Sequence, residues 1–452
     1  MKKNYNSIII GFGKAGKTLA AELAKRGEKV ALIEKSKKMY GGTCINVGCI
    51  PSKSLVTSAA EAALHKDDDF KTKAERYKKA IEEKRRVTEF LRKKNYEKLN
   101  SLDNVTIYDG IGRFAGEKSV EVLSDNGEIF LIEAEKIFIN TGSEPVIPQI
   151  EGIERNPYVY TSETLMDEEK LPEKLVLIGA GYIGMEFASL YAAFGSKVTV
   201  LQDGDIFLPR EDRDVADEIQ KIQENNGVKI QPGAKVLRFE KNKVIYTVEG
   251  EERTAESDAI LLATGRKANT ELLQTEKAGI NLTNRKAIEV DDLLRTNVPG
   301  IWALGDVNGG AQFTFISLDD YRIIISQLNE GTYTRKERKE TAYSVFMATP
   351  LGRVGMTEEQ ARNNNIPFRV VKLPTAAIPK AQVLRKTEGF LKAIIHTETK
   401  KILGAAFLCP EAYELINTVK LAMDLGVDYE YLRDSIYTHP TMTEAFNDLF
   451  SL

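Results

Sequence analysis

Residues 7–34, with the sequence SIIIGFGKAGKTLAAELAKRGEKVALIE, predict a βαβ unit at the start of the chain. The apolar residues before the glycines and before Glu34 are typical of two buried strands, with a helix over residues 14–24 between them. Glu34 follows the last of three glycines by 18 residues and can accept hydrogen bonds from ribose hydroxyls. The glycines have the G-x-G-x-x-G spacing that lets a pyrophosphate approach the backbone, and they are Gly11, Gly13 and Gly16. This unit is therefore predicted to bind a dinucleotide.

The same pattern occurs a second time at residues 175–202, LVLIGAGYIGMEFASLYAAFGSKVTVLQ. Here Gln202 stands where the first unit has Glu34. A repeated dinucleotide fold indicates either two bound dinucleotides or a duplicated fold with one vacant site. Both turns keep all three glycines, which favours two dinucleotides.

Residues 41–53, GGTCINVGCIPSK, contain two cysteines, Cys44 and Cys49, separated by four residues. The one other cysteine is Cys409, which we interpret as a small core residue. A disulfide across so short a loop stabilises a protein weakly, so the pair is expected to be reduced and re-oxidised as part of the chemistry. The alternative, two ordinary buried thiols, is disfavoured by the dinucleotide motif nearby.

The composition is typical of a globular protein with two or three domains, since 42% of its 452 residues are hydrophobic and 29% are charged. Its 63 basic and 66 acidic residues give a formal charge of −3, which does not favour binding to nucleic acid or an anionic membrane. Residues 8–10 are too short for a signal-peptide core, and no apolar run is long enough to cross a bilayer. We therefore expect a cytoplasmic location, where a disulfide is normally catalytic or sensing. Only three histidines occur, and no metal site is expected.

Three further regions complete the predicted organisation. Residues 61–100 are densely charged with apolar residues at helical spacing, which predicts a solvated pair of helices. Residues 105–139 predict short strands with turns at Asp109-Gly110 and Asn126-Gly127. From about Thr341, alternating strands followed by two helices predict an α+β unit for association. The predicted fold class is α/β, with two Rossmann-like dinucleotide-binding domains and a C-terminal α+β dimerisation domain.

Seven landmarks occur in order along the chain, and they include a segment that runs from His439 through Pro440 and Thr441 to Glu444. The other six are the two glycine turns, the cysteine motif, Thr141-Gly142, residues 263–266 (ATGR) and Gly305-Asp306. In these landmarks the chain resembles the class I flavin-dependent pyridine nucleotide–disulfide oxidoreductases, which include dihydrolipoamide dehydrogenase, glutathione reductase and mercuric reductase. Within that family it is most similar to bacterial reactive-chlorine-resistance reductases, whose members include hypothiocyanous acid reductases. The segments similar to that branch are residues 11–20, 39–40, 208–212, 312–322, 354–361 and 447–450.

The resemblance implies FAD as a cofactor and NADH or NADPH as a co-substrate. It implies an FAD-binding domain at residues 1–144 and 267–335, an NAD(P)-binding domain at 145–266 and a dimerisation domain at 336–452. It also implies a homodimer whose active site is shared between the subunits.

The resemblance also implies roles for the residues around the cysteines. Cys49 would be the charge-transfer thiol beside the flavin, and Cys44 the interchange thiol that meets the substrate. Both would open a helix, whose N-terminal dipole lowers a thiol pKa. Lys53 would lie near the flavin with Glu186 as its ion-pair partner, and Tyr182 would cover the flavin face until the nicotinamide displaces it.

His439 is the predicted acid–base residue. An imidazole oriented by a carboxylate, here Glu444, can move a proton to and from Cys44. The resemblance implies that this histidine comes from the other subunit. His65 and His396 have no such partner in the sequence and are interpreted as structural.

The predicted cofactor-binding residues form two sets. Those for FAD are Gly11, Gly13, Gly16, Glu34, Lys35, Gly42, Thr43, Lys53, Gly112, Thr141, Gly142, Asp306, Phe313 and Thr314. Those for NAD(P)H are Gly179, Gly181, Tyr182, Ile183, Gly184, Glu186, Gln202, Gly265 and Arg266. NADH is favoured because no arginine directly follows Gln202 and Asp203 would repel a 2′-phosphate, but Gln202 is not the carboxylate of strict NAD selection.

The oxidant is predicted to be a small molecule. No second cysteine pair occurs at the C-terminal end, and the aromatic residues Phe313 and Phe315 suggest a narrow access. Hypothiocyanous acid fits such an access and the branch that the chain resembles. The alternatives are dihydrolipoamide dehydrogenase activity, reduction of Cu(II) or another metal ion, and, in a different class, a non-enzymatic redox sensor.

Overall fold

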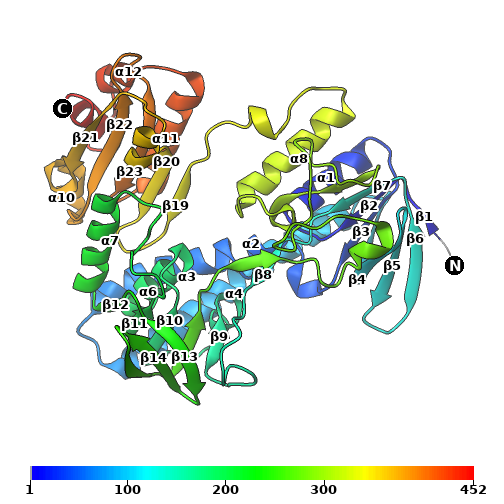
Figure 1. Cartoon of the computed structure of the whole chain (residues 1–452), viewed down its shortest axis with the longest axis horizontal. Coiled ribbons are helices and arrows are strands. Elements are labelled where there is room, and N and C mark those ends of the chain that lie inside the picture. Colours follow the sequence, from blue (N-terminus) through cyan, green and yellow to red (C-terminus); the bar gives the residue numbers. More distant parts are fainter. Residues whose placement is uncertain (1–2) are drawn as a thin grey trace. The chain divides into compact units, whose positions relative to one another are not determined.

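The computed structural model of the protein describes residues 3–452 (Figure 1). The chain forms two compact units. Unit 1 contains the described residues up to Ser54 together with residues 81–147 and 265–338, and unit 2 contains residues 55–80, 148–264 and 339–452. Among the described residues, no helix combines the length and the apolar character that crossing a membrane requires.

Unit 1 is built on an eight-stranded sheet whose strand order is β1-β6-β5-β4-β3-β2-β7-β18. The central strands β4, β3, β2, β7 and β18 are parallel, whereas β4, β5 and β6 pair in antiparallel fashion. The strands are β1 (Lys3–Asn4), β2 (Ser7–Ile10), β3 (Val30–Glu34), β4 (Val105–Gly116), β5 (Ser119–Ser124), β6 (Ile129–Glu133), β7 (Lys136–Ile139) and β18 (Ile301–Ala303). The first predicted βαβ unit is confirmed.

Helices cover this sheet, and α1 packs beside α8 on one of its faces (Figure 1). A short ribbon of β8 (Ser143–Pro145) and β17 (Arg266–Ala268) lies beyond the sheet. The helices are α1 (Lys14–Lys25), α2 (Thr43–Asn46) and α8 (Thr314–Leu328), with single 3₁₀ turns η1 (Lys37–Met39), η3 (Thr275–Ala278), η4 (Gly305–Asn308) and η5 (Arg335–Glu337). The charged segment at residues 61–100 contains the end of α3 (Cys49–Ala62), the turn η2 (Ala63–His65) and one long helix, α4 (Phe70–Asn100). The predicted pair of helices is therefore wrong, because most of the segment is a single helix.

The predicted turn at Asp109-Gly110 is wrong, because β4 continues through it. Up to Asp109 the strand pairs in parallel with β3, and from Gly110 it pairs in antiparallel fashion with β5. A Cβ on Gly110 would lie 2.3 Å from the carbonyl oxygen of Leu123, so glycine is needed here for the close approach of β5. The predicted turn at Asn126-Gly127 is confirmed between β5 and β6.

Unit 2 contains the second predicted βαβ unit in a five-stranded parallel sheet of order β12-β11-β10-β16-β9. Its elements are β9 (Val159–Thr161), α5 (Ser162–Leu165), β10 (Lys174–Ile178), α6 (Tyr182–Phe194), β11 (Lys197–Leu201), α7 (Arg213–Asn225), β12 (Val228–Gln231) and β16 (Ala259–Leu262). An antiparallel sheet of β13 (Lys235–Glu240), β14 (Lys243–Val248) and β15 (Glu251–Glu256) shares a core with it.

The C-terminal part of unit 2 is an antiparallel sheet of order β19-β20-β23-β22-β21 with α11 packed on β20 and β23. Its strands are β19 (Tyr343–Val345), β20 (Leu351–Gly355), β21 (Phe368–Pro374), β22 (Phe390–His396) and β23 (Ile402–Leu408). Its helices are α9 (Glu358–Asn363), η6 (Thr375–Ala377), α10 (Pro379–Leu384), α11 (Ala412–Leu425), α12 (Tyr429–Asp434) and α13 (Ala445–Leu449). Three helices follow the last strand instead of the predicted two, because the helical conformation ends at Gly426, which is left-handed, and again after Asp434.

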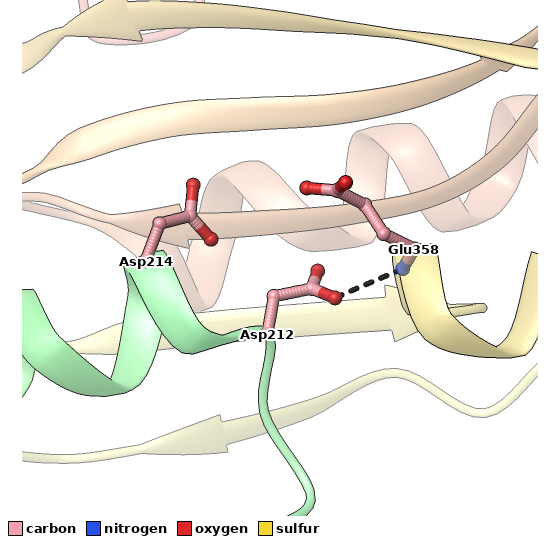
Figure 2. Close-up of side chains that lie close together, drawn as sticks. All are labelled: Asp212, Asp214 and Glu358. Atoms are coloured by element: carbon pink, nitrogen blue, oxygen red, sulfur yellow. Dashed lines mark hydrogen bonds between the residues drawn. The ribbon is translucent and has the colours of Figure 1, made fainter.

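Lys392 on β22 joins the two parts of unit 2 through an internal ion cluster. Its ammonium lies 3.1 Å from Asp212, 2.7 Å from Asp214 and 2.5 Å from Glu358, and its side chain is 1% exposed. Figure 2 shows the three carboxylates turned toward one another, with Asp212 accepting a 2.9 Å hydrogen bond from the backbone N–H of Glu358. Lys392 thus occupies the position in which a bound cation would neutralise these acids.

The carboxylates keep Lys392 charged although it is buried. Burial acts to lower the pKa of Lys392, but hydrogen bonds to Asp214 and Glu358 and the charge of Asp212 outweigh it and raise the pKa. Lys372 on β21 also pairs with Asp214, at 3.1 Å, but its side chain is 41% exposed. The two lysines therefore share one partner and differ in burial.

Replacing Lys392 by methionine leaves the carboxylates of Asp212, Asp214 and Glu358 without their buried counter-charge. We expect Lys392→Met to lower the free energy of unfolding of the holoprotein by about 3 kcal/mol. The matched variant Lys372→Met removes an exposed partner and is expected to cost about 1 kcal/mol or less. Urea unfolding followed by circular dichroism measures both, and equal losses would contradict this account of the cluster.

Candidate active site

Cys44 and Cys49 are brought together at the start of a long helix. Cys44 is the second residue of α2, and Cys49 is the first residue of α3. Their thiols are hydrogen-bonded to each other, and Oγ1 of Thr314 lies 3.7 Å from Sγ of Cys49. Because the sulfurs are already in contact, a small movement brings them to bonding distance. Cys409 is fully buried, as the sequence predicts.

The predicted lowering of the pKa of Cys44 by a helix dipole is wrong. The hydrogen bond with Cys49 raises the pKa of Cys44 well above its ordinary value, and burial adds to this effect. Thr314 and the charge of Lys17 act in the opposite direction. The contact with Cys49 thus favours the protonated form of Cys44.

Thr314, the residue of α8 that contacts Cys49, stands between two aromatic residues, Phe313 and Phe315. The rings of Phe313 and Phe315 stack at a centroid distance of 4.9 Å, and Phe315 is 44% exposed. The two acids of the same helix have structural contacts. Asp320 accepts a 2.7 Å hydrogen bond from the backbone N–H of Gly305, and Asp319 pairs with Arg338 at 2.7 Å.

The first glycine turn fits a pyrophosphate. No side chain caps the N-terminus of α1, and no acidic residue stands in its first turn, so the helix end can attract an anion. A Cβ on Gly42 would lie 2.7 Å from Cα of Gly13. The backbone of the cysteine motif therefore approaches the glycine turn so closely that a side chain on Gly42 would not fit.

Asn140 links this turn to the segment after β18 through hydrogen bonds. Its Oδ1 accepts a 2.9 Å hydrogen bond from the N–H of Gly16, and its Nδ2 donates a 2.6 Å hydrogen bond to the carbonyl oxygen of Leu304. A Cβ on Gly13 would lie 2.4 Å from Asn140 Oδ1, so this glycine leaves room for the amide. The sequence reasoning missed Asn140, although it directly precedes the Thr141-Gly142 landmark.

Glu34 lies at the end of β3, as predicted, and faces the glycine turn. Its carboxylate accepts hydrogen bonds from the backbone N–H groups of Phe12, at 3.0 Å, and Ser36, at 3.2 Å. Burial raises the pKa of Glu34 to about 7, and the two backbone donors act to lower it. The carboxylate remains an acceptor that ribose hydroxyls can reach in this fold.

Asp306 is the best-anchored of the other residues predicted for FAD. Its Oδ2 accepts a 2.7 Å hydrogen bond from Ser143, which in turn accepts a 3.0 Å hydrogen bond from Arg266. Burial raises the pKa of Asp306, against the effects of Ser143 and Arg266. Arg266 and Gly265 belong to unit 1 and contact this region, although the sequence assigned them to the second nucleotide.

The remaining residues of the FAD set are distributed around unit 1. Gly112 lies within β4, where a Cβ would meet the side chains of Ile33 and Ile10, so packing accounts for this glycine. The others lie at the end of β3 (Lys35), in α2 (Thr43), on α3 (Lys53), after β7 (Thr141, Gly142) and at the start of α8 (Phe313, Thr314). Lys35 is exposed.

The second glycine turn, with Gly179 and Gly184 at its ends, has the same form. A Cβ on Gly181 would meet no atom within 4 Å, and no side chain caps the N-terminus of α6. Gln202 follows β11, and its Nε2 donates to the carbonyl oxygens of Gly204, at 2.8 Å, and Ile206, at 2.7 Å. Because Nε2 is used in these hydrogen bonds, the group of Gln202 that can accept a hydrogen bond from a ribose is its uncharged amide oxygen.

Tyr182, the first residue of α6, hydrogen-bonds to a buried carboxylate that the sequence reasoning did not identify. Its hydroxyl donates to Glu211 at 2.5 Å, and the hydroxyl of Tyr343 donates to the same oxygen at 2.8 Å. Arg353 lies 3.5 Å from the second oxygen of Glu211, and both of these charged side chains are at most 3% exposed. Burial and Glu211 raise the pKa of Tyr182. The tyrosine is thus held by a buried ion pair.

Two other residues of the NAD(P)H set lie on α6. Ile183 is exposed. Glu186 is buried, and its Oε1 accepts a 2.8 Å hydrogen bond from the backbone N–H of Phe346. Glu186 belongs to unit 2 and Lys53 to unit 1, so their pairing stays a prediction.

His439 and Glu444 form the pair that the sequence predicts. Nδ1 of His439 donates a 2.8 Å hydrogen bond to Oε2 of Glu444, because an ionised carboxylate can only accept. Thr441 orients the glutamate, since its backbone N–H donates to Oε1 at 3.2 Å. The histidine side chain is 69% exposed, so Nε2 of the neutral ring presents a lone pair at the surface of unit 2.

The two units therefore hold different parts of the predicted site. Unit 1 contains both cysteines and the whole FAD set, and unit 2 contains the second glycine turn, Tyr182, Glu186 and His439. Sequence reasoning missed the buried polar residues that support these groups. They are Asn140, Glu211, Ser317 and Arg353, together with the partly buried Tyr343, and nothing in the charged segment around Glu211 signals its burial in the sequence.

Comparisons with known proteins agree with this geometry. Residues 5–324 match the pyridine nucleotide-disulphide oxidoreductase family, and residues 341–450 match the dimerisation domain of that family. The chain is 50% identical to the probable pyridine nucleotide-disulfide oxidoreductase RclA of Escherichia coli strain K12, with 99% of each chain covered. A dihydrolipoyl dehydrogenase of Corynebacterium glutamicum is 32% identical, with 99% of this chain and 97% of that protein covered.

A solved structure is similar over the whole chain. It is the Cu(II) complex of the HOCl-induced flavoprotein disulfide reductase RclA from Escherichia coli, with a TM-score of 0.93 and 49% identity over 100% of this chain and 99% of that chain. The chain therefore belongs to the pyridine nucleotide-disulphide oxidoreductases, and it is a flavoprotein disulfide reductase, an enzyme that uses FAD and NAD(P)H.

Proposed function

We propose that this enzyme uses NAD(P)H, preferably NADH, to reduce a small electrophilic oxidant in the cytoplasm, and that hypothiocyanous acid is its substrate. The observation that carries the proposal is the contact between Cys44 and Cys49 beside the stacked rings of Phe313 and Phe315 in unit 1. A dithiol with aromatic neighbours suits a small molecule better than a protein disulfide. The likeness to an HOCl-induced reductase supports a role in oxidant defence.

The chemistry of the cysteines accounts for the two electrons. The thiolate of Cys44 attacks the electrophilic sulfur of hypothiocyanous acid, an S–S bond forms, and the S–O bond breaks with release of hydroxide, which takes up a proton. Cys49 then attacks the sulfur of Cys44, the disulfide forms, and thiocyanate leaves. Bound FAD supplies the two electrons of NAD(P)H that restore the dithiol. The net reaction converts NADH and hypothiocyanous acid into NAD⁺, thiocyanate and water.

The cofactors are assigned to the two glycine turns. FAD takes the first turn, where Glu34 meets its ribose and Asp306 its ribityl chain, and NAD(P)H takes the second turn beside Tyr182. The neutral oxygen of Gln202 and the neighbouring Asp203 favour an unphosphorylated ribose, which is the reason for preferring NADH.

His439 is assigned the proton transfer, in a homodimer whose active sites are shared between subunits. The match of residues 341–450 to a dimerisation domain supports a dimer. The Glu444 carboxylate stabilises the imidazolium that forms when His439 takes the proton of Cys44.

The second candidate substrate is Cu(II), because the similar solved structure is a Cu(II) complex. Lipoamide is a weaker candidate, since the dihydrolipoyl dehydrogenase is only 32% identical. A redox sensor without turnover would not need the oriented pair of His439 and Glu444.

The substrate is tested by an oxidant panel with the purified holoenzyme. NADH consumption is followed by its absorbance with hypothiocyanous acid, hypochlorous acid, lipoamide and Cu(II), and each reaction is repeated with NADPH. We expect the highest kcat/KM for hypothiocyanous acid with NADH, because its leaving groups are small and need no binding site of their own. Faster turnover with lipoamide or Cu(II) than with hypothiocyanous acid would contradict the proposed substrate.

The role of the dithiol is tested by Cys44→Ser, which removes the attacking sulfur and is expected to abolish reduction of hypothiocyanous acid. Cys409→Ala is the matched control, because Cys409 is buried in the C-terminal core and is expected to leave kcat unchanged. A Cys44→Ser enzyme with normal turnover would rule out the thiol mechanism.

The shared active site is tested by mixing two inactive variants, Cys44→Ser and His439→Gln. The second is expected to lose about 10²- to 10⁴-fold in kcat, as acid–base residues do. If His439 serves the partner's cysteines, each mixed dimer contains one intact site, and an equal mixture regains about a quarter of the activity after subunit exchange. If mass spectrometry verifies subunit exchange and no activity returns, His439 does not serve the cysteines of the partner subunit.

A further inference from the structure

One face of the long helix α4 packs against the segment that carries the first cysteine, within unit 1. Arg92 donates a 2.8 Å hydrogen bond from its Nε to Oδ1 of Asn46, the last residue of α2. One turn further along α4, the ring of Tyr96 stacks on that of Tyr40, with the centroids 4.8 Å apart. The helix therefore contacts the chain on both sides of Cys44, four residues before it and two residues after it.

The stacked tyrosines anchor this part of α4 to the core of unit 1. Tyr40 is buried, and its hydroxyl hydrogen-bonds to Asp109 on β4. Its ring also lies 5.2 Å from that of Phe12 in the first glycine turn. Tyr96 packs against the same buried cluster. Because the helix is anchored here, Arg92, one turn away, holds its hydrogen bond from a fixed support.

The amide of Asn46 closes its segment on itself. Its Nδ2 donates to the carbonyl oxygens of Tyr40, at 3.0 Å, and Gly42, at 2.9 Å. An arginine side chain has donors only, so its partner must be the amide oxygen, and the NH₂ group of the amide must then face the two carbonyls. Arg92 therefore fixes which way the amide points. A flipped amide would place its oxygen against both carbonyl oxygens and lose these hydrogen bonds.

The position of α2 sets the separation of the two sulfurs. A Cβ on Gly48, the residue before Cys49, would lie 3.0 Å from the carbonyl oxygen of Thr43 and 3.4 Å from Cα of Cys44. The start of α3 is thus packed closely against α2, and the thiols of Cys44 and Cys49 are hydrogen-bonded to each other. Asn46 ends α2, so the contact that holds Asn46 also acts on the cysteine two residues before it.

We propose that Arg92 is a positioning residue of the redox pair. Through Asn46 it holds α2 in the geometry in which Cys44 forms its disulfide with Cys49. The inference rests on the proposed function in that these two cysteines are the pair that is oxidised and reduced. No covalent bond restrains the segment in the dithiol, so without Arg92 the segment gains conformational freedom that it must lose again when the disulfide closes. Arg92 therefore favours the disulfide over the dithiol.

The test measures the equilibrium between dithiol and disulfide in the holoenzyme, without hypothiocyanous acid. Each protein is equilibrated without oxygen in buffers of reduced and oxidised glutathione, where formation of one protein disulfide converts one oxidised glutathione into two reduced ones. Acid quenching, alkylation and mass spectrometry give the fraction of the Cys44–Cys49 disulfide. Arg92→Met is expected to lower the equilibrium constant for disulfide formation about fivefold, the order expected when one freed residue must be ordered again.

Lys93→Met is the matched control, because Lys93 is the next residue of α4, is exposed and pairs with Glu97. Its equilibrium constant should equal that of the parent enzyme, and the flavin absorbance of each variant reports its folding. In an Asn46→Ala background, Arg92→Met is expected to cause no further change, because the partner of the guanidinium is gone. The proposal is overturned if Arg92→Met has the equilibrium constant of the parent, or if its effect is the same size in the Asn46→Ala background.

The result does not depend on the substrate. If the enzyme does not reduce hypothiocyanous acid but Arg92→Met shifts the equilibrium, the proposed substrate fails and the role of Arg92 stands. If hypothiocyanous acid is reduced and the equilibrium does not shift, the role of Arg92 fails alone.

Discussion

The structure of unit 1 depends on how closely backbone segments approach at the carboxyl ends of its parallel strands. The turn after β2, the end of β7 and the segment after β18 meet there, and Asn140 hydrogen-bonds to both of its neighbours. Cβ atoms on Gly11 and Gly16 would lie 2.3 and 2.4 Å from carbonyl oxygens of this crossing. Glycine is therefore needed at these positions because neighbouring backbone leaves no room for a side chain, in addition to any need of a ligand. Because the turn is fixed in this way, the uncapped end of α1 and Glu34 have defined positions for a nucleotide.

The cysteine pair depends on the same crossing, since its motif begins with Gly42 against Gly13. The electrostatics of the pair are a balance between opposing effects. The hydrogen bond between Cys44 and Cys49 holds a proton on Cys44, whereas Lys17 favours its loss. Loss of that proton would leave a thiolate, which is the nucleophilic form of a cysteine. In the function proposed above, an oriented histidine, His439, takes up that proton.

Unit 2 uses buried charge to join its nucleotide-binding sheet to its C-terminal sheet. Lys392 reaches Asp212 and Asp214 at the start of α7, and Arg353 reaches Glu211 one residue before them. The second pair also fixes the hydroxyl of Tyr182 at the mouth of the second glycine turn. Buried ion pairs add little net stability, but removing one partner is costly, so they specify one arrangement of the two sheets.

The sequence by itself determined both βαβ units, the proximity of Cys44 and Cys49, the pairing of His439 with Glu444 and the family, because these depend on local periodicity and on short fixed spacings. It misjudged Asp109-Gly110, where a glycine that usually marks a turn instead admits a neighbouring strand. It also misjudged the acidity of Cys44, which depends on burial and on a hydrogen bond and not on position in a helix. The partners of Glu211, Asn140 and Lys392 come from segments far apart in the chain, so only the tertiary structure decided which polar residues are buried together.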